Sequence, residues 1–241
     1  MNSRFINFRS ALLCTALFVV PSLSIAQDVP STAFCNTGRT EKPVSLAGCL
    51  ATELVSPINP VDGGAIVDGN WLLATPYPTA TYTAPAPNPC SLVSRYTPVP
   101  INEPWNSWYN PDDGRSQWIS PLGGGTTPPG WYVYASYFLV PPALDGYPSY
   151  ELNMTGQLMA DDQMAYIYVA DFSAGEVSCG QIAALSSNGF TSWTPFSASA
   201  PVRPNSVGYV YFIVLNDYST SHTVNPTGLR VEYQSTSFRP Y

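Results

Sequence analysis

The chain has 241 residues and a formal net charge of −7, with only 10% of its residues charged and 45% hydrophobic. This length fits one domain of roughly 150–200 residues with a short appendage. The negative charge argues against nucleic acid or an anionic membrane as a partner, since both bind through basic patches. Abundant Pro, Gly, Ser, Thr and Tyr residues are typical of an extracellular β-protein with many turns.

Residues 1–26 have the pattern of an export signal peptide. Arg4 and Arg9 form a positive start, residues 11–20 are apolar, and Ser24 and Ala26 are the small residues of a cleavage site. The apolar run is too short for a membrane-spanning helix, which needs about 20 residues. We expect a secreted, extracellular or cell-surface protein, or a periplasmic one, with no transmembrane segment in a mature chain that begins at Gln27.

Four cysteines remain outside the signal peptide: Cys35, Cys49, Cys90 and Cys179. An even number in an exported chain favours disulfides over metal binding or catalysis. Three pairings are possible. We favour Cys35–Cys49, which closes a short polar loop, and Cys90–Cys179, which ties two distant loops together. No Cys-x-x-Cys spacing occurs, so a zinc site is disfavoured.

The remaining chain divides into an arm and one domain. Residues 27–56 have little strand periodicity and are predicted to be an N-terminal arm that lies on the domain. Residues 57–241 are predicted to form a β-sandwich domain. Within it, the proline-rich residues 76–111 are expected to be an ordered surface excursion, because they hold too many aromatic residues for a disordered tether.

Alternating apolar and polar residues predict about eight strands and, after the signal peptide, no helix. The predicted strands cover residues 68–74, 116–120, 131–140, 150–159, 164–170, 192–198, 206–216 and 228–234. The segment 131–140 is apolar or aromatic on both faces, so we place it in the middle of the sandwich. The sequence therefore predicts an all-β, two-sheet antiparallel β-sandwich of the jelly-roll type.

The last predicted strand begins after the turn Asn225-Pro226-Thr227 and has one apolar and one polar side. Leu229 and Val231 point one way, and we expect them to close the core. Arg230 and Glu232 point the other way, and we expect them to face out.

Several sequence blocks together resemble a known module. They are Asp68-Gly69-Asn70-Trp71, Ser116-Gln117-Trp118-Ile119, Gly130-Trp131-Tyr132-Val133-Tyr134, Gly156 through Ala160-Asp161-Asp162, Phe190-Thr191-Ser192-Trp193-Thr194-Pro195-Phe196, and Asn225 through Glu232. This succession, over about residues 60–236, resembles the galactose-binding-like jelly-roll module of exported, often exosortase-sorted, bacterial surface proteins. The resemblance implies the fold, and kinship with carbohydrate-binding modules. Because no Pro-Glu-Pro sorting tail follows, we do not expect the anchor to carry over.

Asp161 and Asp162 lie in a predicted tight turn between two strands. With Asp171 or Asp217 nearby, these carboxylates are candidate ligands for a calcium ion, which prefers oxygen donors. The alternative is a solvated turn in which Asp favours the required backbone conformation. Calcium is the one cofactor that the sequence suggests.

Aromatic residues in a loop are the second candidate site. Trp105, Trp108 and Tyr109 lie beside Asn106, a mixture that could stack on the apolar face of a sugar and hydrogen-bond its rim. The alternative is that these rings cover the edge of the sandwich.

Catalysis is poorly supported by the sequence. His222 is the only histidine, and no Gly-x-Ser-x-Gly motif accompanies it. Glu151 with Asp161 or Asp171 would be the best guess for a glycosidase pair, but Glu151 has the pattern of an ordinary outward residue. We therefore expect no enzyme.

We expect instead a secreted, non-catalytic protein that binds a glycan or cell-surface polymer through exposed aromatic loops. The alternative is a structural subunit of an extracellular matrix, filament or surface layer, which self-associates through its N-terminal arm or its strand edges.

Overall fold

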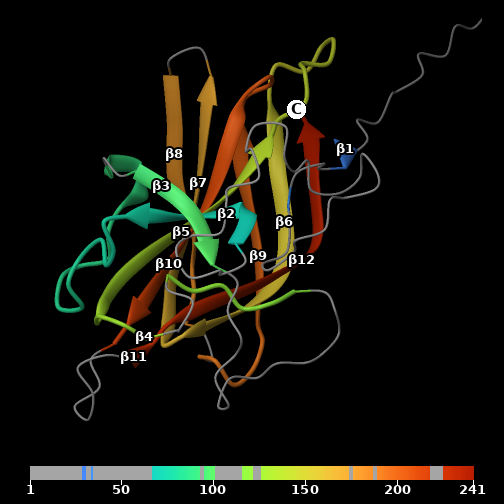
Figure 1. The fold of residues 1–241 in the computed structure, drawn as a ribbon. Coiled ribbons are helices and arrows are strands. Elements are labelled where there is room, and N and C mark those ends of the chain that lie inside the picture. Colours follow the sequence, from blue (N-terminus) through green and yellow to red (C-terminus); the bar gives the residue numbers. More distant parts are fainter. Residues whose placement is uncertain are drawn as a thin grey trace, which may run out of the picture.

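The computed structural model describes residues 29–30, 34, 67–92, 95–100, 116–121, 126–173, 176–186, 189–217 and 225–241. These residues form two antiparallel sheets that pack against each other (Figure 1). The predicted all-β, two-sheet sandwich is confirmed. None of the described segments is a helix long and apolar enough to cross a membrane.

The larger sheet has six strands. In spatial order they are β3 (Arg95–Pro100), β2 (Val67–Thr75), β5 (Gly130–Leu139), β10 (Val207–Asn216), β7 (Gln163–Ser173) and β8 (Glu176–Ala184). β5 and β10 are central, as predicted for residues 131–140, and they pair from Val207 opposite Leu139 to Asn216 opposite Gly130. Strands β3 and β8 were not predicted.

The smaller sheet has four strands, in the order β1 (Val29–Pro30), β12 (Gly228–Pro240), β6 (Tyr150–Asp161) and β9 (Thr194–Val202). The short strands β4 (Thr126–Thr127) and β11 (Asn225–Pro226) pair separately. The chain changes sheet between β1 and β2, at β5–β6, β6–β7, β8–β9 and β9–β10, and between β10 and β12. This repeated crossing is the connectivity expected of a jelly roll.

The main core lies between the two sheets. Strand β6 shows how the sequence builds it, since its residues alternate between buried and half-buried from Tyr150 to Leu158. Leu229 and Val231 of β12 are fully buried in the same core, as predicted. Gly208 of β10 makes room for Phe138, because a Cβ at Gly208 would lie 2.0 Å from that ring.

The expected N-terminal arm contributes to the smaller sheet. In β1, Val29 pairs with Phe238 and Pro30 pairs with Ser237. The ring of Phe34 then stacks on Phe138, with 5.0 Å between ring centroids. The pairing of β1 places Val29 and Pro30 beside the last strand, β12 (Figure 1).

Arg230 and Glu232 do not face solvent, which corrects the sequence prediction. Their side chains lie on the outer side of β12 but have exposed fractions of 0% and 3%. Aromatic residues from two other segments pack on this side of the smaller sheet: Trp118 with Met159 forms a second small core, joined by Phe190 and Trp193. The period-two pattern gave the correct side of the strand, but not what covers that side.

A chain of polar contacts satisfies the buried charges. The Arg230 side chain donates from Nε to Ser116 Oγ (2.7 Å) and from Nη2 to the Ser116 carbonyl (2.8 Å). The Ser116 hydroxyl donates to Glu232 Oε1 at 2.7 Å, and Gln157 Nε2 donates to Glu232 Oε2 at 2.9 Å. The guanidinium also lies 5.2 Å from the ring centre of Trp193. The cluster therefore attaches two loops to the outer side of the smaller sheet.

Replacing one charge of this cluster is expected to destabilise the fold strongly. Arg230→Met should lower the free energy of unfolding by about 3–5 kcal/mol, because Glu232 stays buried without its cation. The double variant Arg230→Met/Glu232→Met should lose less than the sum of the two single variants. Urea denaturation measures the free energy of unfolding of the wild type, Arg230→Met, Glu232→Met and the double variant. A single variant within about 0.5 kcal/mol of the wild type, as for an ordinary surface position, would contradict a buried pair.

Candidate functional site

The structure tests only part of the predicted sites. Trp105, Asn106, Trp108 and Tyr109 lie outside the described residues, and the sugar platform predicted there stays a prediction. Cys35 and Cys49 also lie outside them. The second predicted disulfide is confirmed: Cys90 is bonded to Cys179, and their Cα atoms are 5.6 Å apart.

This disulfide holds a proline-rich segment, residues 76–92, on the outer face of the larger sheet. At the near end of the segment, the Trp131 amide donates to the Ala80 carbonyl, and the Thr79 amide donates to the Trp131 carbonyl, both at 2.8 Å. The Trp131 indole Nε1 donates to the Ala84 carbonyl at 2.9 Å. Cys90 then bonds to Cys179 in β8. The segment thus covers the β5 side of this face, and its Cys90 end is linked to β8 by the disulfide.

The same outer face is lined by aromatic side chains from three neighbouring strands. We call this group the tyrosine face: Trp131 of β5, Tyr166 and Tyr168 of β7, and Tyr209 and Tyr211 of β10. The rings of Tyr209 and Tyr211 stack with 6.0 Å between centroids, and those of Tyr166 and Tyr168 meet edge to face at 6.3 Å. Alternation along each strand puts these rings on one side of the sheet, opposite the main core.

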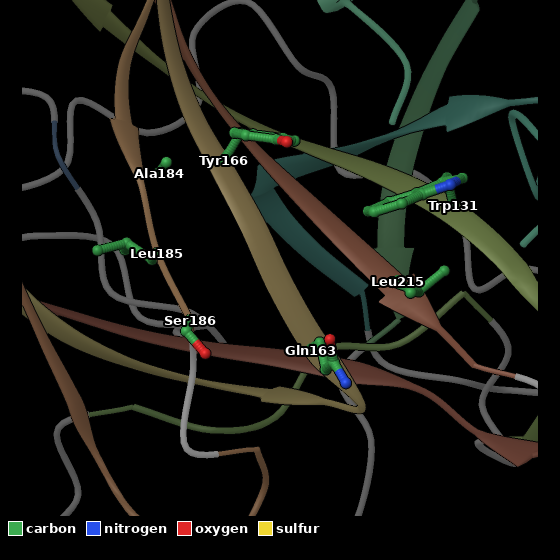
Figure 2. A pocket seen from close by; sticks show the side chains of 7 residues that line it. All are labelled: Trp131, Gln163, Tyr166, Ala184, Leu185, Ser186 and Leu215. Atoms are coloured by element: carbon green, nitrogen blue, oxygen red, sulfur yellow. The ribbon is translucent and has the colours of Figure 1, made fainter. Parts of the chain in front are cut away.

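A hollow of about 380 Å³ lies at one end of the tyrosine face (Figure 2). It is lined by Trp131, Gln163, Tyr166, Ala184, Leu185, Ser186 and Leu215. The rings of Trp131 and Tyr166 and the side chain of Leu215 are its apolar part, while Gln163 and Ser186 bring polar groups. Strand register brings three of these residues side by side, since Leu215 of β10 pairs with Trp131 of β5 and with Gln163 of β7.

The lining of the hollow suits a neutral, polyhydroxylated ligand. Aromatic rings offer a flat apolar surface for the C–H side of a sugar, and an amide and a hydroxyl can hydrogen-bond its rim. None of the seven lining residues carries a charge. The sequence predicts such groups in the loop with Trp105 and Trp108 instead. The signal that could have found them is the second apolar side of residues 131–140, together with the alternating tyrosines of residues 166–168 and 209–211.

The opposite end of this face carries an exposed apolar row. It runs across four strands in register, through Leu139, Val207, Phe172 and Val177, which are 37%, 40%, 40% and 58% exposed. Phe172 also contacts Tyr209 edge to face at 5.7 Å. The tyrosine face therefore lies between the hollow and this row.

Asp161 and Asp162 lie at the end of β6 and tie neighbouring segments together. The Thr227 hydroxyl donates to the Asp161 carbonyl at 2.6 Å. Asp162 Oδ2 accepts hydrogen bonds from the Asp217 amide (2.7 Å) and from Asn225 Nδ2 (2.8 Å). These contacts join Asp162 with Asp217, one of the two nearby acids that the sequence suggested.

Asp171, the other acid suggested nearby, is engaged elsewhere. It is buried, and Arg203 Nε donates to its Oδ1 at 2.7 Å. In the part of the chain that the structure describes, no three His, Cys, Asp or Glu side chains gather in a group that could hold a metal. A calcium ion at Asp161 and Asp162 therefore stays a prediction.

Several tyrosines of the two apolar clusters have raised pKa values. Burial is the main cause for Tyr132, whose pKa it raises to about 12, and for Tyr211, whose pKa lies higher still. Tyr134 and Tyr233 are shifted in the same direction, again mainly because they are buried. These phenols therefore remain protonated and uncharged at any physiological pH.

The raised pKa values predict alkaline destabilisation. A phenol of the unfolded chain ionises near pH 10, whereas these phenols of the folded chain ionise at higher pH. The folding stability that they support is therefore complete below about pH 10 and is lost as pH rises toward the folded pKa, at up to about 1.4 kcal/mol per pH unit for each group. Melting curves between pH 8 and 12 measure the loss, and Tyr132→Phe should make it shallower. A melting temperature unchanged up to pH 12 would contradict the burial of these hydroxyls.

The fold and the site define a two-sheet β-sandwich with an aromatic outer face. No family model matches this chain, and no curated protein matches it. One matching solved structure is an uncharacterized protein of Listeria monocytogenes, in complex with glucose, magnesium and calcium. Its identity is 11% and its TM-score is 0.23, over 46% of this chain and 9% of that chain. A likeness at this level carries no argument about fold or ligand.

Proposed function

We propose that this protein is a secreted, non-catalytic β-sandwich that binds a neutral glycan or cell-surface polymer on its tyrosine face. The observation that carries the proposal is the uncharged hollow whose lining combines the rings of Trp131 and Tyr166 with the polar groups of Gln163 and Ser186. In this proposal the main contact lies on the face of the larger sheet. The loop with Trp105 and Trp108 remains a candidate for additional contacts.

The charge distribution favours a neutral ligand over an acidic one. Binding of an acidic polysaccharide usually depends on lysine or arginine near the site, and the lining of the hollow has neither. The formal net charge of −7 would also repel an anionic chain at low ionic strength. A neutral polysaccharide can stack on the rings without this electrostatic penalty.

The disulfide supports the proposed location. Cys90 and Cys179 are paired across 89 residues of sequence, and such bonds persist in oxidising compartments. Together with the predicted signal peptide, this favours export. The resemblance to bacterial surface modules is part of the same proposal.

Tyr166→Ala is the variant that tests the site. Loss of one stacking ring should weaken glycan binding by at least about fivefold, which corresponds to about 1 kcal/mol. Neutral and acidic polysaccharides are first compared on a glycan array, and the best neutral one is then titrated by calorimetry. Phe172→Ala is the matched control, because it removes an exposed ring from the far end of the same face.

The proposal fails if the folded protein binds nothing on the array, or if the two variants lose the same affinity. Preference for acidic polysaccharides would also overturn the neutral-ligand argument. If Trp105→Ala abolishes binding while Tyr166→Ala leaves it unchanged, the site lies in the loop instead.

A further inference from the structure

The edges of the two sheets differ in how they are protected against strand addition. In the part of the chain that the structure describes, the edge strands are β1 and β9 of the smaller sheet and β3 and β8 of the larger sheet. Three of them contain proline, namely Pro30 in β1, Pro195 and Pro201 in β9, and Pro98 and Pro100 in β3. Proline cannot donate a backbone hydrogen bond, so it discourages another strand from pairing there.

Strand β8 has no such protection. Its nine residues, from Glu176 to Ala184, include no proline and no lysine, and their side chains are exposed or half-buried throughout. The strand pairs with β7 on one side and forms the margin of the six-stranded sheet on the other (Figure 1). Such an edge presents backbone amides and carbonyls to which a further strand can pair. At its first residue, the Glu176 carbonyl already accepts a hydrogen bond from Arg203 Nη2 at 3.1 Å, so the pairing would use the edge from Val177 onward.

The charge pattern of β8 also permits it to pair with a copy of itself. Its one charged residue is Glu176, whose Oε2 accepts a hydrogen bond from Arg203 Nη1 at 2.9 Å within the same chain. In an antiparallel pair of two β8 strands, each Glu176 end lies opposite the Ala184 end of the other strand. The two carboxylates are therefore far apart, and no like charges oppose each other across the pair.

We propose that two copies of this protein associate edge to edge through antiparallel pairing of their β8 strands. The pairing is isologous, with a two-fold axis perpendicular to the sheet, and it joins the two larger sheets into one continuous sheet. Rotation about this axis keeps both tyrosine faces on the same side of the assembly. A dimer would therefore present two equivalent faces to one extended polymer, which raises avidity. The pairing itself does not depend on the proposed glycan binding.

A lysine placed on the edge strand tests the proposal. Wild-type protein should form a dimer whose population rises with concentration in sedimentation velocity experiments. Val177→Lys should weaken this dimer at least about tenfold, because lysine on an edge opposes strand addition. Val207→Lys is the matched control: it makes the same change in the same exposed row but two strands away from the edge, and it should leave the dimer unchanged.

Gly180→Lys gives a second edge variant near the middle of β8. A Cβ at Gly180 would meet nothing within 4 Å, so the added side chain should not disturb the monomer. It should weaken the dimer at least as much as Val177→Lys, since the two lysines would lie close together near the two-fold axis. Melting temperatures of the variants confirm that each monomer is folded.

Hydrogen exchange identifies the edge directly. As protein concentration rises, amides of residues 176–184 should gain protection, while those of the opposite edge, residues 95–100, should not. Three results would overturn the proposal. The wild type could stay monomeric at every concentration up to about the millimolar range, or Val177→Lys and Val207→Lys could weaken the dimer equally. In the third, amide protection would appear on β3 and not on β8. Equal dissociation would mean that copies associate through the exposed apolar row of the face.

Discussion

The ten-residue antiparallel pairing of β5 with β10 is the constraint on which both the core and the candidate site depend. It holds Tyr132, Tyr134 and Phe212 toward the smaller sheet and leaves Trp131 and Tyr211 on the outer face. Because side chains alternate along a strand, a slip of one residue would exchange these two sets. The same register brings Leu215 beside Trp131, and the hollow is built from that contact.

Both sheets bury part of their outer faces under loops, by different means. Over the larger sheet, residues 76–92 are held by backbone bonds to Trp131 and by the Cys90–Cys179 disulfide. Over the smaller sheet, the buried Arg230 and Glu232 hold Ser116 and the aromatic residues around it. A fully buried arginine is stable here because its partners satisfy it, and losing one partner would leave a charge in a dry site. The tyrosine face is only partly exposed under its loop: Tyr166, Tyr168 and Tyr209 are half-buried, while Trp131 and Tyr211 are buried.

An aromatic face and an unprotected strand edge on one sheet suit a protein that works on extended polymers. The hollow of each copy has an uncharged lining, so binding there would lack charge-assisted hydrogen bonds. Edge pairing of two copies would place equivalent faces on one side without requiring any change in the fold. The glycan-binding and self-associating alternatives suggested by the sequence are therefore compatible, because they use different parts of the larger sheet.

The sequence alone determined the fold class and most of the strands, and it favoured the Cys90–Cys179 disulfide among three possible pairings. Period-two alternation is local, and it correctly assigned residues 131–140 to the centre of a sheet and Leu229 and Val231 to the core. It could not show what lies on the other side of a strand, which is why Arg230 and Glu232 were expected in solvent. It also missed β3, whose prolines resemble a loop, and β8, whose exposed residues lack alternation. Only the tertiary structure decided the hollow, because strand register brings together lining residues that are distant in sequence. It also decided that β8 is an edge, because the order of strands in a sheet is set by pairing and not by the local sequence of one strand.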